Sequence, residues 1–282
     1  MGIKINGKEL ALQYKKEIKE TILQKVKDGK RYPTLASVMV GDDGGSVSYT
    51  KNQEKISEEL GICYRLNSFM QSITEEELIN EIKKLNEDST VDGIILQLPL
   101  PSHLDEDKIV EHISGKKDVD GLTDINLGRF YKGKDSFIPC TARSILELIN
   151  SQQESIKGKN VVVIGRSNIV GKPVSYLLVN ENATVTMCHS QTANVEGICK
   201  KADILVSAIG RPGYITKDFV KDGAMVIDVG TTMVEGKVKG DVDFQEVIEI
   251  ADFVSPVPGG VGAVTTTMLM KNTLEAWIKN VQ

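Results

Sequence analysis

A chain of 282 residues is long enough for two packed domains, each with its own hydrophobic core. Hydrophobic residues make up 40% and charged residues 26%, a balance that fits neither a disordered chain nor a membrane protein. The net charge of -5 argues against nucleic acid as a partner, because surfaces that follow a phosphate backbone need an excess of Lys and Arg.

The start of the chain and its cysteines indicate the compartment. Met1–Leu10 carries Lys4, Lys8 and Glu9, so it lacks the apolar core of a signal peptide, and no apolar run suits a membrane span. We therefore expect a cytoplasmic protein without a membrane partner. The cysteines form no C-x-x-C pair and the histidines lack metal-ligand spacing, so we expect reduced cysteines and no bound metal. These residues are Cys63, Cys140, Cys188, Cys199, His103, His112 and His189.

Helical and strand-like patterns alternate along the first third of the chain. Apolar residues at helical spacing alternate with short apolar or β-branched runs, which predicts βαβ units around a mostly parallel sheet. In chain order the segments are helix Leu10–Val26, strand Thr34–Val40, helix Ser46–Leu60, strand Cys63–Ser68, helix Glu75–Leu85 and strand Gly93–Leu96.

A turn-rich stretch separates this part from the next. Gly115–Lys134 carries four glycines and many charges, and Pro139-Cys140-Thr141 then favours a helix start with Thr141 as its N-cap. We therefore place a domain boundary here, with 140–264 as one domain and 1–139 plus 265–282 as the other. The last helix, about Thr265–Lys279, is expected to pack away from the sheet of 140–264.

The βαβ rhythm resumes after the boundary. Its strands are short apolar runs separated by helices or turns, so the second domain is predicted to be Rossmann-like. In chain order the segments are strand Val161–Ile164, helix Val170–Val179, and strands Ala183–Cys188, Asp203–Ala208 and Ala224–Val229.

A glycine turn joins the first strand and helix of this second domain. Gly165 follows the strand and Gly171 opens the helix, an arrangement that aims backbone N–H groups and the helix dipole at a phosphate. The glycine spacing departs from G-x-G-x-x-G, so the turn by itself indicates either a nucleotide site or a strand-to-helix turn whose glycines serve close packing.

The end of the next strand bears on the choice of nucleotide. NAD-selective Rossmann units place an acidic residue there for the ribose 2′-hydroxyl, whereas this strand ends in Cys188-His189-Ser190. Arg166 can pair with a 2′-phosphate and Ser190 can hydrogen-bond it, which favours NADP over NAD. His189 is either a cofactor contact or a polar strand-end residue.

Three polar residues of the first domain are candidates for a ligand site. Tyr49 lies in a predicted helix, Gln97 ends a strand and Asp120 lies in the turn-rich stretch. Polar groups at the carboxyl ends of parallel strands border the crevice in which α/β folds bind ligands. Each also has a structural interpretation, as a core aromatic, a strand-end hydrogen bonder and a turn former respectively.

Six segments in order carry a family resemblance. They are Val40–Asp43, Asp92–Pro101, Lys117–Gly121, Pro139–Thr141, Gly165–Pro173 and Pro256–Gly262. With them the sequence resembles the methylenetetrahydrofolate dehydrogenase and methenyltetrahydrofolate cyclohydrolase family, whose members are usually bifunctional. The resemblance runs through essentially the whole chain.

The resemblance implies two α/β domains flanking a cleft, with folate bound by 1–139 plus 265–282, NADP bound by 140–264, and a homodimeric assembly. It implies that Tyr49 orients the pterin, that Gln97 hydrogen-bonds near the reacting carbon, and that Asp120 anchors the polar edge of the pterin. It places the 2′-phosphate on Arg166, Ser167 and Ser190. The further implied contacts are Gly165, Ile169, Gly171, His189 and Thr231 for the cofactor, and Pro258, Gly259 and Gly260 for folate.

The departure from the family pattern that bears on the chemistry lies in the predicted helix Ser46–Leu60. The family places a lysine four residues after the tyrosine, on the same helix face, and this chain has Gln53 there. Glutamine cannot exchange a proton at neutral pH, and Lys51 and Lys55 lie elsewhere around the helix. We therefore expect the dehydrogenase to be kept and the cyclohydrolase to be weak or absent.

The sequence leaves three alternative functions open. Gln53 can be a harmless change in a fully bifunctional enzyme that produces 10-formyltetrahydrofolate. The chain can instead be another two-domain Rossmann dehydrogenase, acting on an amino acid or shikimate, because fold by itself does not decide function. A protein that binds folate and nucleotide without catalysis is the third reading.

Overall fold

The computed structural model describes residues 1–281, and the chain divides into two compact units. Unit 1 comprises Met1–Leu12 and Thr141–Thr265, and unit 2 comprises Gln13–Cys140 and the chain from Thr266 onward. Each unit has a parallel sheet with helices, which confirms the expected α/β fold class. The first twelve residues group with unit 1 rather than with the first half of the chain, because β1 (Ile3–Lys4) pairs in parallel with β11 (Phe253–Val254).

Unit 1 is built on a six-stranded parallel sheet in the order β1-β11-β8-β7-β5-β6. The chain runs from β5 outward to β6 and then returns to β7 on the other side of β5, so the carboxyl ends of β5 and β7 form the point at which a doubly wound sheet binds its ligand. The remaining bounds are β5 (Asn160–Ile164), β6 (Thr184–Cys188), β7 (Ile204–Ser207), β8 (Met225–Asp228), α6 (Cys140–Asn150), α7 (Gly171–Asn180), α8 (Val195–Cys199), η1 (Lys217–Phe219), α9 (Phe244–Val247) and the antiparallel hairpin β9 (Thr232–Val234) and β10 (Lys237–Lys239).

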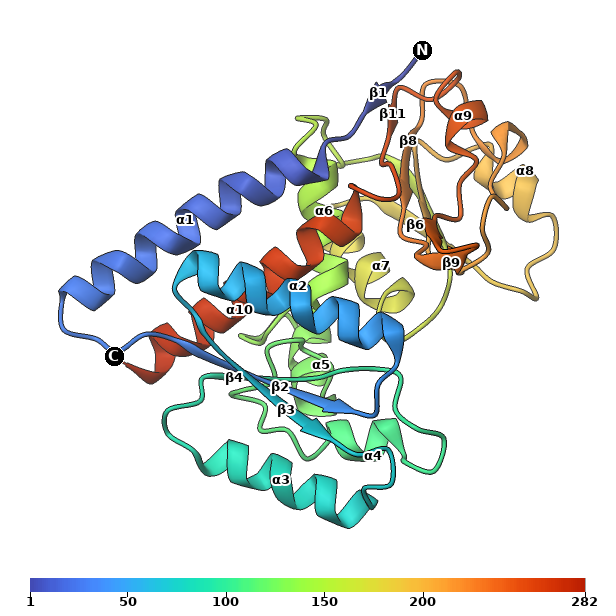
Figure 1. Ribbon diagram of the computed structural model, residues 1–282. Helices are drawn as coiled ribbons and strands as arrows, with labels where there is room; N and C mark the ends of the chain where they lie inside the picture. Colours follow the sequence, from blue (N-terminus) through green and yellow to red (C-terminus); the bar gives the residue numbers. More distant parts are fainter. Residues whose placement is uncertain (282) are drawn as a thin grey trace. The chain divides into compact units, whose positions relative to one another are not determined.

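Unit 2 is built on a three-stranded parallel sheet with β2 (Thr34–Val40) between β3 (Cys63–Phe69) and β4 (Gly93–Leu96). Figure 1 shows α3 (Glu75–Glu87) along one face of this sheet and α2 (Gly44–Leu60) on the other. Apolar residues of β2, β4 and α3 form a single buried cluster, so burial of that helix face holds the layer together. The other helices are α1 (Gly7–Lys27, which begins in unit 1), α4 (Glu106–Val110), α5 (Asp124–Tyr131) and α10 (Val261–Asn280).

Helix α2 begins and ends at residues suited to those positions. The Asp43 carboxylate accepts a hydrogen bond from the Ser46 N–H at 2.9 Å and caps the N-terminus. Gly61 adopts a left-handed conformation with φ of 81° and donates its N–H to carbonyls of the last turn. These two caps fix where the helix that carries Tyr49 and Gln53 begins and ends.

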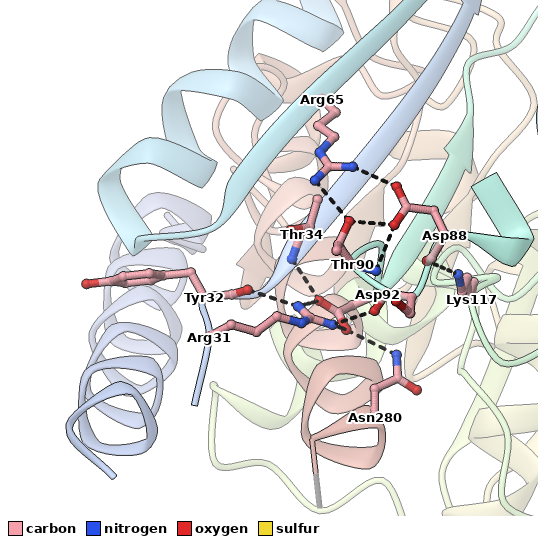
Figure 2. A network of polar contacts seen from close by, with 10 residues as sticks. Arg31, Tyr32, Thr34, Arg65, Asp88, Thr90, Asp92, Lys117 and Asn280 are labelled. Carbon is pink, nitrogen blue, oxygen red and sulfur yellow. Dashed lines mark hydrogen bonds and ion pairs between the residues drawn. The ribbon is translucent and has the colours of Figure 1, made fainter. Parts of the chain in front are cut away.

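An ion pair between the half-buried Arg31 and the buried Asp92 fixes the amino-terminal edge of this sheet (Figure 2). The Asp92 carboxylate is fully buried and accepts hydrogen bonds from both terminal nitrogens of Arg31 at 2.7 Å. It also accepts from the Thr34 N–H at 2.9 Å and from Asn280 Nδ2 at 3.1 Å, so it ties β2 and β4 to the end of α10. Four donors on one carboxylate meet the hydrogen-bonding requirement of a buried charge.

Three sequence-based expectations were incomplete or wrong. Helix α6 begins at Cys140, so Thr141 lies within its first turn and is not the N-cap. The turn-rich stretch contains the helix α5, which the buried carboxylate of Asp118 anchors through the Thr123 cap. The hairpin β9–β10 was also not expected, because its strands are too short and exposed to show a hydrophobic pattern.

Among the residues described, no helix has the length and apolar character that crossing a membrane requires.

Candidate active site

The carboxyl edge of the sheet in unit 2 gathers polar side chains. Because successive side chains of a strand point to opposite faces, Ser37 of β2 and Gln97, just after β4, face α2 rather than the apolar α3 layer. Gln97 Nε2 donates to Ser37 Oγ at 2.9 Å and to Gln53 Oε1 at 3.1 Å. All three residues are buried, so the contacts are shielded from water.

Gln53 lies one helical turn after Tyr49 and is fully buried. Its Oε1 accepts a second hydrogen bond, from the Tyr64 hydroxyl at 3.0 Å, while its Nε2 has no partner among the described residues. Lys51 and Lys55 are both exposed, as expected from their angles around the helix. The position therefore presents a neutral amide with one unused pair of N–H donors.

Tyr49 is half-buried on the same helix and shares a hydrogen bond with Thr266 of α10. Asn52 Nδ2 also donates to Thr266 Oγ1, at 3.2 Å, so this threonine fixes the relation of the two helices. Burial raises the pKa of the Tyr49 hydroxyl, and the negative charge of Asp120 adds to that effect. The hydroxyl is therefore a neutral donor at physiological pH.

Asp118 and Asp120 have different surroundings. Asp118 is buried and accepts hydrogen bonds from the backbone of the following turn, from Thr123 Oγ1 at 2.7 Å and from Asn126 Nδ2 at 2.8 Å. Asp120 receives hydrogen bonds from Cys140, and burial raises its pKa to about 6, with the charge of Asp118 adding to the shift. Asp118 thus builds the turn, and Asp120 is the acid available to a ligand.

The four candidates of the first half thus belong to one unit and are linked. Gln53 and Gln97 are in direct contact, and the charge of Asp120 acts on Tyr49. Sequence reasoning missed the residues that orient them, Ser37, Tyr64 and Thr266. Alternation along β2 identifies Ser37 as the one polar side chain on the face that α2 covers. The sequence around Tyr64 and Thr266 has no pattern that indicates their role in the site.

The glycine turn of unit 1 follows β5. Gly165 has φ of 128° and donates its N–H to the Cys188 carbonyl at 2.9 Å. A Cβ at Gly165 would lie 2.5 Å from the Ala208 carbonyl oxygen, and one at Gly171 would lie 2.3 Å from the Gly165 carbonyl oxygen. Neither position has room for a side chain, so the backbones of β5, α7 and the loop after β7 approach closely here.

The residues between these two glycines surround the N-terminus of α7. Ser167 Oγ accepts a hydrogen bond from the Val170 N–H at 3.1 Å and shapes the turn. Arg166, Ser167 and Ile169 are exposed, and 42% of Ile169 is accessible. The turn therefore offers a cation, a hydroxyl and an apolar side chain beside a helix N-terminus.

Residues His189 and Ser190 follow the neighbouring strand β6. The bond between Gly165 and Cys188 brings the end of β6 beside the glycine turn. His189 is half-buried and its Nδ1 accepts from the Gln191 N–H at 3.2 Å, whereas Ser190 is exposed. Thr231, after β8, is exposed as well.

Two buried carboxylates that the sequence analysis missed hold the loops of this edge. Asp241 accepts from Ser207 Oγ at 3.0 Å and from the backbone N–H groups of Ile209 and Arg211. Asp228 accepts from three backbone N–H groups, and burial raises its pKa to about 6. Acidic residues in loops carry no sequence signal of burial, so only the tertiary fold reveals this role.

The loop before α10 contains the other expected folate contacts. Pro258 is exposed, Gly259 has φ of 106°, and a Cβ at Gly260 would lie 2.5 Å from the Pro256 carbonyl oxygen. A Cβ at Gly7 would lie 2.4 Å from the Gly260 carbonyl oxygen, so this loop packs tightly on the start of α1.

Metal ligands and disulfides are not among the features found. Within residues 1–281, no group of three or more His, Cys, Asp or Glu side chains could hold a metal ion. The four cysteines, all of which lie in that range, form no disulfide with one another.

Comparison with known families matches both parts of the chain. Residues 5–120 match the catalytic domain of tetrahydrofolate dehydrogenase/cyclohydrolase, and residues 139–281 match its NAD(P)-binding domain. The chain belongs to the tetrahydrofolate dehydrogenase/cyclohydrolase family. This membership confirms the resemblance and argues against the alternative of an amino-acid or shikimate dehydrogenase.

Relatives within this tetrahydrofolate dehydrogenase/cyclohydrolase family match from end to end. The bifunctional protein FolD of Clostridium acetobutylicum is 59% identical over 276 residues, which span 98% of this chain and 99% of that protein. The crystal structure of the bifunctional FolD of Campylobacter jejuni is 39% identical, with a TM-score of 0.96 and 99% of each chain covered. The FolD of Trypanosoma brucei, solved with NADP cofactor and an inhibitor, is 37% identical, with a TM-score of 0.94 over 100% of this chain and 99% of that one.

Proposed function

We propose that this protein oxidises 5,10-methylenetetrahydrofolate to 5,10-methenyltetrahydrofolate with NADP, and that its cyclohydrolase activity is weak or absent. Family membership and end-to-end similarity to bifunctional FolD proteins support the first part. The buried amide of Gln53, in place of a lysine, carries the second.

The dehydrogenase step needs positioning more than acid–base chemistry. The hydride leaves a methylene carbon between two folate nitrogens, whose lone pairs stabilise the amidinium product. Tyr49 and Gln97 orient the pterin and the reacting carbon, and Asp120 anchors the polar edge of the pterin. NADP, when bound, would supply the hydride acceptor.

The glycine turn of unit 1 fits a dinucleotide. Gly165 and Gly171 keep the turn tight, because a Cβ there would meet backbone carbonyl oxygens at 2.5 and 2.3 Å, and a pyrophosphate would bind at the N-terminus of the helix α7 that this turn opens. Arg166, Ser167 and Ser190 are exposed where a 2′-phosphate would lie, which favours NADP over NAD. Ile169, His189 and Thr231 would contact the rest of the cofactor, and Pro258, Gly259 and Gly260 would contact folate.

Hydrolysis of the methenyl product asks more of the protein. Water must attack the amidinium carbon, and protons must move as the ring opens. Gln53 can donate its unused N–H groups to the substrate, but it has no proton to exchange at neutral pH. Its neighbours are neutral as well, because Gln97 is an amide and burial raises the pKa of Tyr64 to about 12.

We also propose that the protein acts as a homodimer in the cytoplasm. Strand β3 is an edge of its sheet. Leu66 within the strand is 45% accessible, and Met70, which directly follows the strand, is 79% accessible. An exposed edge strand with apolar side chains favours association with a second copy. Analytical ultracentrifugation checks this, because a sedimenting species of about 31 kDa at micromolar concentration would contradict it.

A paired assay tests the catalytic proposal. NADP reduction with methylenetetrahydrofolate and hydrolysis of methenyltetrahydrofolate are measured with the same preparation, and NAD is run beside NADP. Fast NADP reduction with hydrolysis close to the uncatalysed rate is the expected result. Comparable rates would establish a bifunctional enzyme, and tight binding of both ligands without NADP reduction would establish a protein that only binds them.

A further inference from the structure

A cavity of about 530 Å³ opens in unit 2. Its walls are the turn Ser114–Lys116, the exposed side of α5, the segment 135–137 and the end of α10. The volume suits a small organic ligand. None of the residues proposed to bind folate lines it.

The cavity adjoins the amino ends of the strands. Asn280, which lines it, donates to Asp92 at 3.1 Å (Figure 2), and Asp92 immediately precedes β4. Gln97 follows the other end of β4, five residues later, which corresponds to about 16 Å of extended chain. The cavity and the residues proposed for folate therefore belong to opposite edges of the same sheet.

Basic residues dominate the charge of this cavity. Lys116, Arg129 and Lys279 line it together with a single acid, Asp135. This excess of positive charge contrasts with the net charge of -5 of the whole chain. Lys279 Nζ lies 2.9 and 3.0 Å from the two carboxylate oxygens of Asp135 and largely compensates it.

Arg129 is held in a defined orientation. Its Nε donates to the backbone carbonyl of Asp135 at 2.8 Å, and its terminal nitrogens have no partner among the described residues. A guanidinium fixed in this way presents paired donors that match two oxygens of a phosphate. Ile125, which is 59% accessible, adds apolar surface to the same walls, whereas Phe137 is only 5% accessible and has Lys279 Nζ 5.5 Å over its ring.

We propose that this cavity binds a small organic phosphate dianion. Arg129 receives the phosphate through its terminal nitrogens, Lys116 adds a second positive charge, and the organic part lies against Ile125. This site is distinct from the proposed dehydrogenase site, so either proposal can fail without the other.

Calorimetric titration with phenyl phosphate tests this site. The protein is first saturated with NADP, so that the glycine turn of unit 1 is not available to the probe. Saturable binding is expected, and Arg129→Gln and Lys116→Gln should each weaken it about tenfold. Asp135→Asn should tighten binding, because it removes the one acid and releases Lys279.

Matched variants separate this site from general charge effects. Lys132→Gln also removes one positive charge near α5, but Lys132 does not line the cavity, so the affinity should be unchanged. Absence of saturable binding, or equal weakening by Lys132→Gln and Arg129→Gln, would overturn the proposal. Loss of binding in Arg166→Gln with retention in Arg129→Gln would assign the probe to unit 1 and overturn it as well.

Discussion

The side chain of Gln97 donates a hydrogen bond from Nε2 to Oε1 of Gln53 at 3.1 Å, between two buried residues. The acceptor lies at the helix position for which the family resemblance implies a lysine. An ammonium group there would be a donor itself, so Gln97 would have to offer its carbonyl oxygen instead. The observed amide pair is therefore matched to glutamine.

Replacing Gln53 with lysine is expected to restore hydrolysis of methenyltetrahydrofolate. Gln53→Lys places an ammonium one helical turn from Tyr49, and general acid–base help of this kind contributes roughly a hundredfold or more to a rate. Hydrolysis and NADP reduction are measured in parallel. NADP reduction should change much less than hydrolysis.

Gln53→Met is the matched control for this gain of activity. Methionine has a similar length and no proton to transfer, so hydrolysis should stay at the background rate. Equal hydrolysis by the lysine and methionine variants would show that the loss of glutamine, and not the new amine, changes the site.

Removing the cation of the glycine turn should separate the two nicotinamide cofactors. Arg166→Ala deletes the exposed guanidinium that is proposed to pair with the 2′-phosphate, a charged hydrogen bond worth about 1.5 to 3 kcal/mol. The KM for NADP should rise about ten- to hundredfold, while the KM for NAD changes little. A parallel rise in both would place Arg166 elsewhere on the cofactor.

The ionised carboxylate of Asp120 should lower the free energy of unfolding at neutral pH. Burial raises its folded pKa to about 6, above the unfolded value, so the neutral form stabilises the fold at low pH and this contribution is lost as pH rises through about 6. Asp120→Asn stays uncharged, so at pH 7 the free energy of unfolding should rise by about 1 to 3 kcal/mol. At pH 4 it should hardly change, and urea denaturation at both pH values checks the difference.

A methyl group at Gly165 should damage the glycine turn. It would meet the Ala208 carbonyl oxygen at 2.5 Å at a φ of 128°, so Gly165→Ala should lower stability by roughly 2 to 4 kcal/mol and weaken NADP binding. Gly158→Ala is the control, because Gly158 also has a positive φ but nothing within 4 Å of a Cβ. A similar loss in both variants would mean that φ and not the close approach is limiting.

The buried carboxylate of Asp92 should depend on Arg31. Arg31→Ala leaves the charge of Asp92 uncompensated and should lower the free energy of unfolding. Because Arg31 is one-third exposed and solvent screens the pair, we expect a decrease of about 2 to 3 kcal/mol. The double variant Arg31→Ala with Asp92→Asn should be more stable than Arg31→Ala. Unfolding can be followed by fluorescence of the one tryptophan, Trp277, which is fully buried in the same unit. A double variant less stable than the single one would contradict this account.

Strong periodic segments were predictable from sequence. The strand Thr34–Val40 appears as the pattern placed it, and the helix predicted over Ser46–Leu60 is observed over Gly44–Leu60, because apolar spacing reports burial directly. Helix α5 was missed, since it is anchored by Asp118 rather than by its own apolar stripe. The grouping of β1 with unit 1 was missed for a similar reason, because two residues that pair with β11 carry no pattern of their own.

The sequence by itself determined the family and the type of each candidate residue, including the glutamine at position 53, because chemistry follows from residue identity in ordered motifs. Only the tertiary structure decided the partners and the burial of those residues. Ser37, Tyr64 and Gln97 come from three different strands or strand ends, and their meeting around Gln53 depends on sheet register and helix packing. Pairing between residues far apart in the chain leaves no local mark, and so the neutral, fully buried surroundings of Gln53 could be established only from the fold.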